Sequence, residues 1–440
     1  NLVVMYDGYL AMPWAPEFGL SGGLTFFEVK DPCAPTVVGH ASPGIMRETH
    51  ALGFSPVGGR WAVTMAMPRF REGGLLFWDV SDPTAPAVVN AMALPGFRYP
   101  DAYARIVFAA FWQAPYVYAA GADNGVYVVD ATNPTAPELV NQYVFEPVLR
   151  AGQIQAIGDL LIVTSAEQAR TALLDISDPA NPQPIPGGDF VSTDGEGTPR
   201  EAYFSTASGG HIYYARKDDG GGLMVWDIRD PTRPVYAGGH RSDGNGGYVF
   251  VKGGRAFTGE SRFAAVYDVS DLSAITEISR LALPGDLDTA TPIGNVVVLS
   301  VDDKAEDSDG DGVAEGTVVV PFDTEPDAQP PQVTWVYPAD GGILTPTSRV
   351  GVGFDEMVDV KSAWEGSVRL YRADAVTPAE GRVDGWVSAQ EHLVNFWPRR
   401  PLTPGTAYVL ELPAGGVTDY NGNALAEPFT ARFTVAGVAP

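Results

Sequence analysis

LLFWDVSDP at residues 75–83 and LMVWDIRDP at residues 223–231 are two copies of the phrase that decides the fold. Each copy joins a short apolar run to an acidic residue, a polar spacer and Asp-Pro. Such a run bounded by turn residues predicts a β-strand. Pro fixes φ, and the Asp side chain can accept a backbone hydrogen bond, so Asp-Pro predicts a turn. The acidic residues are therefore expected to be structural.

The phrase occurs seven times, with its first acidic residues spaced by 41 to 55 positions. Within one period, residues 49–93 contain four apolar runs separated by turn signals. A period of about 40 to 50 residues with four strands is typical of one propeller blade. We therefore expect an all-β protein whose residues 1–327 form a seven-bladed β-propeller. The seven acidic positions are Glu28, Asp79, Asp130, Asp175, Asp227, Asp268 and Asp323.

GGLLFWDVSDPTAP (73–86) and GGLMVWDIRDPTRP (221–234) carry a resemblance to the LVIVD-repeat family of bacterial propellers. The resemblance covers residues 1 to 327 and implies an extracytoplasmic repeat protein without an assigned reaction. The chain departs from the pattern where Leu272 replaces Pro in the sixth copy. The seventh copy also lacks an obvious outermost strand. Residues 101–113 fit an amphipathic helix in isolation, but their alignment with the other copies favours an innermost strand and its neighbour.

Composition excludes several classes of partner and site. The formal net charge of −26 repels phosphate backbones and anionic membrane surfaces, so nucleic acid is not expected as a partner. No apolar run approaches the roughly 20 residues of a membrane span, so membrane insertion is not expected. The single cysteine, Cys33, excludes an intramolecular disulfide and a cysteine-based zinc site. The start Asn-Leu-Val-Val-Met is interpreted as that of a mature or excised segment of a larger polypeptide.

The strongest chemical signal is the acidic stretch VDDKAEDSDGDGVAEG at residues 301–316. Alternating carboxylates can converge on calcium when the loop coils around it, and Gly312 permits the sharp turn. The stretch resembles the calcium loops of thrombospondin type 3 repeats and EF-hands. Val318 stands at the twelfth position, where an EF-hand has Glu, which excludes a complete EF-hand. A solvated acidic hairpin tip is the alternative. The predicted calcium ligands are Asp307, Asp309, Asp311, Val313 (through its carbonyl) and Glu315.

Residues 328–440 are expected to form a second domain. After a proline-rich linker, six alternating runs predict a small β-sandwich. FDEMVD (354–359), NFWPRRPLTPGTAY (395–408) and TDYNGNAL (418–425) resemble bacterial Ig-like domains of the S-layer type, which implies a spacer or display unit. Asp419, Asn421 and Asn423 are expected to form a hydrogen-bonded turn, with metal contact as the alternative. The six runs are residues 332–338, 348–355, 367–372, 391–397, 407–413 and 429–435.

An enzyme site at the mouth of the central channel is the competing interpretation. Polar residues at the starts of the inner strands are expected to lie near one end of the channel, where a propeller also needs polar groups to meet water. No His-Glu-x-x-His motif is present, so a zinc hydrolase is not expected. The polar candidates are Glu48, His50, Asp101, Arg105, Gln153, Arg200, Glu201, Asp286 and Asp288. The aromatic residues that could form a glycan- or protein-binding face, or simply pack the blades, are Trp14, Phe97, Tyr99 and Trp112.

Together these patterns favour a non-enzymatic binding or scaffolding module, secreted or displayed on the bacterial cell surface and stabilised by calcium. Its expected partners are a protein or glycan of unknown identity and the rest of a larger polypeptide. A propeller hydrolase or lyase is the alternative.

Overall fold

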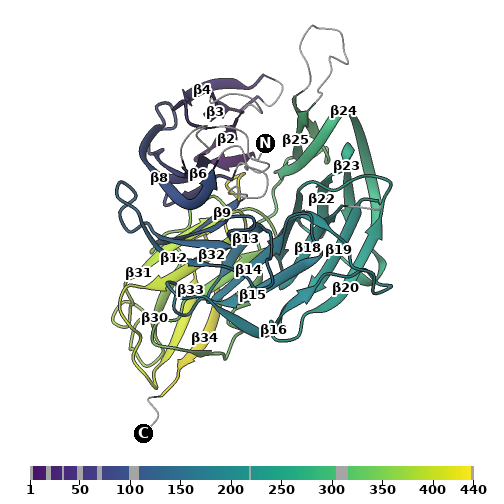
Figure 1. The fold of residues 1–440 in the computed structure, drawn as a ribbon. Helices are drawn as coiled ribbons and strands as arrows, with labels where there is room; N and C mark the ends of the chain where they lie inside the picture. Colours follow the sequence, from purple (N-terminus) through teal and green to yellow (C-terminus); the bar gives the residue numbers. More distant parts are fainter. Residues whose placement is uncertain are drawn as a thin grey trace.

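The computed structural model describes residues 3–15, 21–31, 34–46, 53–66, 72–98, 109–217, 220–303 and 316–437. Its strands form a β-propeller (β1–β26) and a C-terminal sandwich (β27–β34), which confirms the predicted all-β class (Figure 1). One short 3-10 helix, Leu272–Ala274 (η1), interrupts the strands in this part of the chain. In the same residues no helix is long and apolar enough to cross a membrane.

Five four-stranded antiparallel sheets form the first five blades, in chain order. In these blades the first strand lies nearest the central channel, where first strands of neighbouring blades contact each other. The strands are Val4–Tyr6 (β1), Tyr9–Trp14 (β2), Gly23–Glu28 (β3) and Thr36–Ala41 (β4); Ser55–Val57 (β5), Trp61–Ala66 (β6), Glu72–Asp79 (β7) and Ala87–Arg98 (β8); Ala109–Gln113 (β9), Tyr116–Ala120 (β10), Val126–Asp130 (β11) and Glu138–Tyr143 (β12); Ala151–Ile157 (β13), Leu160–Ser165 (β14), Arg170–Asp175 (β15) and Gln183–Val191 (β16); Ala202–Ser208 (β17), His211–Arg216 (β18), Gly222–Asp227 (β19) and Val235–Arg241 (β20).

Blades six and seven share one long strand. A six-stranded sheet contains Val249–Lys252 (β21), Arg255–Gly259 (β22), Ser261–Asp268 (β23), Thr276–Ile293 (β24), Val296–Asp303 (β25) and Thr317–Pro321 (β26). The first part of β24 pairs with β23 as the outer strand of blade six, and its last part pairs with β25 as the inner strand of blade seven. Blade seven therefore has three strands over the described residues, as the degenerate seventh copy predicted. Val298 of β25 packs against Val3, Met5 and Leu10 of blade one, which closes the ring.

The Asp-Pro turns have the structural role that the sequence predicted. The Asp79 Oδ1 atom accepts a hydrogen bond from the Ser81 backbone N at 3.0 Å, and the Asp82 Oδ1 atom accepts one from the Thr84 backbone N at 2.9 Å. Each turn between the third and fourth strands of blades two to six repeats this pair of contacts two residues apart. The repeated aspartates therefore build turns and are not a catalytic set.

The C-terminal sandwich consists of two four-stranded sheets. One has the order β27-β29-β32-β31, and the other has the order β28-β34-β33-β30 with a parallel β28–β34 pair. All six predicted strands are present; β28 and β31 were not predicted. The strands are Val333–Tyr337 (β27), Ile343–Leu344 (β28), Val350–Phe354 (β29), Arg369–Arg372 (β30), Gly385–Gln390 (β31), Leu393–Pro398 (β32), Ala407–Leu412 (β33) and Phe429–Val435 (β34).

The sandwich covers one face of the propeller. This face carries the turns between the first and second strands of the blades, and the turn of every blade lies against a sandwich residue. In Figure 1 the yellow-green sandwich strands accordingly lie against the teal inner strands. From blade one to blade seven the pairs are Asp7 with Lys361, Gly59 with Lys361, Ala114 with Ser388, Gly158 with Asn395, Gly210 with Trp335, Gly253 with Asp355 and Gly294 with Asn421.

The propeller and the sandwich share a hydrophobic core. Val350 and Phe354 of the sandwich belong to the same buried cluster as blades one to three. At the contact with blade four, two glycines bring the backbones together. A Cβ atom at Gly158, whose φ is +54°, would lie 2.4 Å from the Tyr337 carbonyl oxygen, and one at Gly351 would lie 2.5 Å from the Gly158 N atom. The sandwich is therefore docked tightly on the propeller.

Candidate functional site

The β31–β32 hairpin of the sandwich enters the central channel of the propeller. Over the described residues, the first strand of each of the first five blades has no hydrogen-bonded neighbouring strand on the side that faces the channel. Side chains of the hairpin form hydrogen bonds with the backbone groups of these strands. The Gln390 Oε1 atom accepts a hydrogen bond from the Trp112 N atom at 3.0 Å, and its Nε2 atom donates to the Ala110 carbonyl at 3.1 Å. The Ser388 Oγ atom accepts one from the Ala114 N atom at 3.1 Å. The hairpin therefore plugs one end of the channel.

Asn395 is the most connected side chain of this plug. Its Oδ1 atom accepts hydrogen bonds from the Gly158 N atom at 2.7 Å and from the Gln113 Nε2 atom at 3.0 Å. Its Nδ2 atom donates to the Ala156 carbonyl at 2.9 Å. The residue is 2% exposed. Buried polar groups cost free energy when they lose their partners, so Asn395 holds blades three and four to the sandwich.

We expect Asn395→Ala to lower the free energy of unfolding by about 2 kcal/mol, because it leaves buried donors and an acceptor without partners. Urea denaturation followed by tryptophan fluorescence measures this change. The control is Asn90→Ala, since Asn90 lies on an outer strand and donates to an exposed carbonyl. Equal stabilities for the two variants would show that the hairpin does not occupy the channel.

The tip of the hairpin places two titratable side chains at the base of the channel. Glu391 is 7% exposed, and its Oε2 atom accepts a hydrogen bond from the Gln155 Nε2 atom at 3.0 Å. Burial raises the pKa of Glu391 to about 7. His392 is hydrogen-bonded through its Nε2 atom to the Ala207 carbonyl, and burial lowers its pKa to about 4. Near neutral pH the tip therefore holds a neutral imidazole beside a carboxyl group that ionises far less readily than an exposed glutamate.

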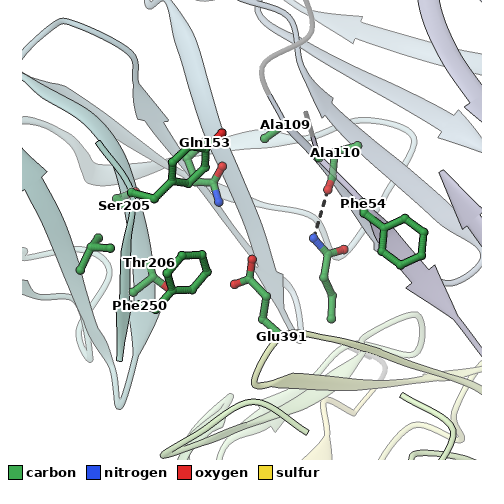
Figure 2. A pocket seen from close by; sticks show the side chains of 12 residues that line it. Phe54, Ala109, Ala110, Gln153, Ser205, Thr206, Phe250 and Glu391 are labelled. Carbon is green, nitrogen blue, oxygen red and sulfur yellow. Dashed lines mark hydrogen bonds between the residues drawn. The ribbon is translucent and has the colours of Figure 1, made fainter. Parts of the chain in front are cut away.

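Above the tip lies a narrow cavity, seen in Figure 2. The cavity is lined by Phe54, by residues of β9, β13, β17 and β21, and by Gln390 and Glu391 of the hairpin. Its empty space, which includes space open to solvent, is about 430 Å³, and only about 20 Å³ is wide enough to take the centre of a water molecule. A buried water needs roughly 10 to 15 Å³ of this kind of space. The cavity therefore has room for one or two water-sized species.

Among the predicted channel-mouth residues that the structure describes, those that do not line the cavity are Arg200, Glu201, Asp286 and Asp288. Gln153 lines the cavity, as predicted. Arg200 instead pairs with Asp194, with an Nε–Oδ2 distance of 2.7 Å. Asp286 lies on β24 opposite Asp303 of β25. The candidates Glu48, His50, Asp101 and Arg105 lie outside the described residues.

The predicted calcium ligands Asp307, Asp309, Asp311, Val313 and Glu315 also lie outside the described residues. The structure describes the strands on either side, with β25 ending at Asp303 and β26 beginning at Thr317. The calcium site therefore stays a prediction.

Of the aromatic residues that the sequence offered as a binding face, those that the structure describes pack within the blades instead. Phe97 and Trp112 are fully buried, and Trp14 is half-buried. The Trp14 ring stacks on His40, and its Nε1 atom donates to Thr25. Tyr99 lies outside the described residues. The described aromatic candidates thus support the blades and do not form a sugar-binding surface.

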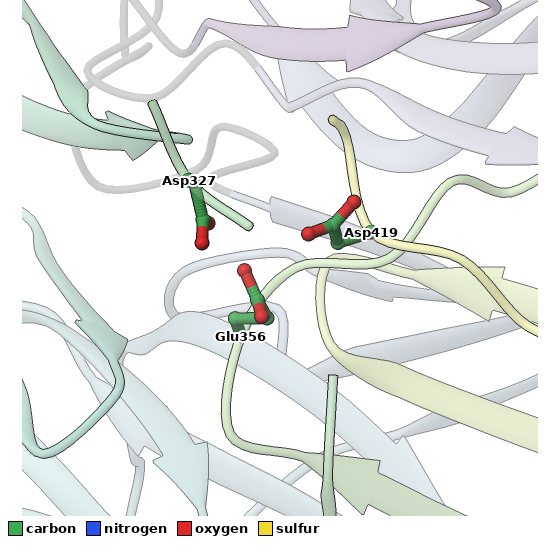
Figure 3. A group of neighbouring side chains, drawn as sticks. All are labelled: Asp327, Glu356 and Asp419. Carbon is green, nitrogen blue, oxygen red and sulfur yellow. The ribbon is translucent and has the colours of Figure 1, made fainter. Parts of the chain in front are cut away.

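A second cluster of ionisable groups lies where the sandwich meets blade six, and sequence reasoning missed it as a set (Figure 3). Carboxylate oxygens of Asp327, Glu356 and Asp419 lie within 4.8 Å of one another. The Lys252 Nζ atom pairs with Asp327 Oδ2 at 2.7 Å and with Glu356. Burial raises the pKa of Glu356 to about 7 despite the ammonium group. An ammonium group already supplies the positive charge here, so the cluster is an ion-pair network.

Asp419 also forms the turn that the sequence predicted. Its Oδ1 atom accepts hydrogen bonds from the backbone N atoms of Asn421 and Asn423, both at 2.8 Å. The Asn423 Nδ2 atom donates to the Asp327 carbonyl at 3.1 Å, which ties the turn to the segment leaving the propeller. The turn is therefore part of the junction.

Two family models match parts of this chain. The model of the bacterial Ig-like domain matches residues 327–435, which is the sandwich. The LVIVD repeat model matches residues 115–144 and 206–240, which lie in blades three and five. The chain carries LVIVD repeats and a bacterial Ig-like domain. Two blades of the propeller thus match LVIVD repeats, and the hairpin that plugs the channel belongs to the Ig-like domain. A comparison with curated proteins gives no match.

Solved structures confirm the propeller fold. The periplasmic gluconolactonase of Pseudomonas aeruginosa matches with a TM-score of 0.50 at 12% identity, over 60% of this chain and 78% of that chain. A protein from Lactobacillus plantarum has a TM-score of 0.50 at 13% identity, over 64% and 87%. A hypothetical selenium-binding protein from Sulfolobus tokodaii has a TM-score of 0.51 at 10% identity, over 67% and 82%. At such low identity these likenesses show the fold alone.

Proposed function

We propose that this chain is a non-catalytic binding or scaffolding module of a larger extracellular or cell-surface bacterial protein. The plugged channel is the observation that carries the proposal. A propeller enzyme needs a concave site with converging reactive groups. In the described structure, the Ig-like hairpin fills one end of the channel and leaves room for one or two water-sized species. Docking of the Ig-like domain instead produces one closely packed unit.

Repeat type and domain composition support the extracellular location. LVIVD repeats are joined here to a bacterial Ig-like domain, and one of the similar propellers is named as periplasmic. The net charge of −26 suits a soluble module that does not bind nucleic acid. The proposed partner is a protein or glycan, and we infer that it binds the propeller face opposite the Ig-like domain, because that domain covers the other face. The rest of a larger polypeptide is a further partner.

Turnover of glucono-δ-lactone tests the non-catalytic proposal, because one similar propeller is named a gluconolactonase. We expect hydrolysis by the protein to equal that of the buffer. The alternative function is a hydrolase or lyase at the channel mouth, and the raised pKa of Glu391, about 7, favours it because such a carboxyl group suits acid–base catalysis. Turnover that is abolished by Glu391→Gln would establish the alternative and refute the scaffold.

Calcium binding by the acidic loop is part of the proposal. Asp307, Asp309, Asp311, Glu315 and the carbonyl of Val313 are the proposed ligands, since alternating carboxylates suit a calcium ion. We expect a dissociation constant of about 10⁻⁴ to 10⁻³ M, as in extracellular calcium modules.

The paired substitution Asp309→Asn and Asp311→Asn should weaken calcium binding at least about tenfold by calorimetry, because it removes two charged ligands. The control pair Asp374→Asn and Glu380→Gln changes the net charge equally at exposed positions of the Ig-like domain. Unchanged binding by the loop variant would place calcium elsewhere.

A further inference from the structure

The side chain at the tip of the Ig-like hairpin occupies an unusual position. Glu391 has a φ of 55°, in the left-handed region that favours Gly, Asn and Asp. Its carboxyl group is buried at the base of the channel and faces the cavity (Figure 2). A small or polar turn residue would suit the backbone better, so the backbone conformation does not account for the carboxylate. A residue held in a sparsely populated conformation is a reason to look for a function.

The Glu391 charge has no protein counter-charge among the described residues. Two effects act on the pKa of Glu391: burial raises it, and the hydrogen bond from the Gln155 amide lowers it. The Gln155 amide carries no positive charge. His392 beside it is kept neutral by burial, which lowers its pKa to about 4. Burial and the charge of Glu391 raise the pKa of Tyr420 in the Ig-like domain, so the Tyr420 hydroxyl is neutral and supplies no positive charge. A buried ionised carboxylate without a positive partner is costly.

Polar side chains of the propeller line the same space. Gln153, Ser205 and Thr206 line the cavity above the carboxylate (Figure 2). Ser205 and Thr206 are buried. The Ser205 hydroxyl is also hydrogen-bonded to the Thr164 hydroxyl at 2.7 Å, and the Thr206 Oγ1 atom accepts a hydrogen bond from the Gln155 Nε2 atom at 3.5 Å. Carboxylate, hydroxyl and amide oxygens are the ligands of hard cations, and the free space fits one or two particles the size of water.

We propose that the central channel binds one hard inorganic cation at the Glu391 carboxylate, with oxygen ligands from Gln153, Ser205 and Thr206. The cation supplies the missing counter-charge and joins the Ig-like domain to blades four and five, from which the other ligands come. This site is separate from the acidic loop of residues 301–316. It also does not depend on whether the module binds a partner or catalyses a reaction.

Thermal unfolding at pH 8 tests the proposal. The protein carries Asp309→Asn and Asp311→Asn, which removes ligands predicted for the loop. Sodium, potassium and calcium chlorides are compared with N-methyl-D-glucamine chloride at equal ionic strength, because that organic cation is too large for the cavity. We expect at least one small cation to raise the Tm, with a rise that shrinks at pH 5.5, where the carboxyl group holds a proton.

Two variants decide whether the effect belongs to the channel. Glu391→Gln keeps the shape and removes the charge, and we expect it to abolish the rise in Tm. Thr206→Val keeps the volume and removes one oxygen, and we expect it to weaken the cation titration several-fold while the protein stays folded. A rise of equal size in the parent and in both variants would overturn the site, as would the absence of any cation effect in the parent. A rise present in the unsubstituted protein and lost on changing Asp309 and Asp311 would assign the effect to the loop and also overturn the channel site.

Discussion

Lys252→Met is expected to destabilise the folded protein by about 3 to 5 kcal/mol, the cost of breaking a buried ion pair by removing one partner. The side chains of Lys252, Asp327 and Glu356 are 14%, 8% and 7% exposed. Without the ammonium group, Asp327, Glu356 and Asp419 would face each other with oxygens within 4.8 Å. Urea denaturation in the presence of a chelator measures the loss, since the chelator prevents calcium from replacing the ammonium group.

The pH dependence of this loss identifies its cause. Unpaired carboxyl groups in the folded variant have raised pKa values, so the folded state binds more protons than the unfolded state and stability falls as the pH rises. The deficit of Lys252→Met should therefore be smaller at pH 5 than at pH 8. Lys30→Met is the control, because Lys30 pairs with Glu28 while 87% exposed, and it should match the wild type. A deficit that is the same at both pH values would show that lost packing, not uncompensated charge, causes it.

Local sequence patterns predicted the propeller fold because each blade repeats the same apolar run followed by the same type of turn. The continuous apolar run LLFW predicts a strand buried on both faces, and Phe77 and Trp78 are accordingly fully buried. Asp79 and Asp82 accept the turn hydrogen bonds that their spacing predicts. The missing outer strand of blade seven was also visible, since VVVPFDTEP is not followed by another apolar run before the linker. These features depend on contacts within one blade, and such contacts follow from the order of residues along the chain.

Docking of the Ig-like domain was not predicted, because it joins residues that are about 100 to 350 positions apart. In the sequence, nothing distinguishes Asn395 from other strand residues. In the structure, its side chain forms hydrogen bonds with the backbone of Gly158 and Ala156. Glu391 was predicted as the start of a strand, and it is the tip of a hairpin. A weak signal was present: Ser388, Gln390 and Asn395 are polar residues in the otherwise apolar strands of the hairpin. Sequence alone gives no partner for such residues, whereas the structure shows them paired with inner strands.

Glu391 and His392 should give opposite pH dependences to the stability of the docked state. Glu391 has a folded pKa of about 7 against an ordinary value of 4.5, so the folded state holds the extra proton and stability falls as the pH rises from 4.5 to 7. His392 has a folded pKa of about 4 against 6.5, so the unfolded state holds the extra proton and stability rises from pH 4 to 6.5. Each contribution amounts to about 3 kcal/mol, and the two cancel in the wild type where their ranges overlap.

Removing one group should therefore reveal the contribution of the other. We expect the stability of Glu391→Gln, relative to wild type, to rise by about 3 kcal/mol between pH 4.5 and 7, because the unfavourable ionisation of the carboxyl group is gone. His392→Gln keeps a donor for the Ala207 carbonyl, and its relative stability should fall by a similar amount between pH 4 and 6.5. Urea midpoints in N-methyl-D-glucamine buffer measure both profiles without a small cation. If the stability difference between variant and wild type did not change with pH, both side chains would be solvated in the folded state, and the hairpin would not enter the channel. If instead the difference for Glu391→Gln changes with pH and this change disappears when the small cation is restored, the result would link the buried carboxylate to the cation that we propose to balance its charge.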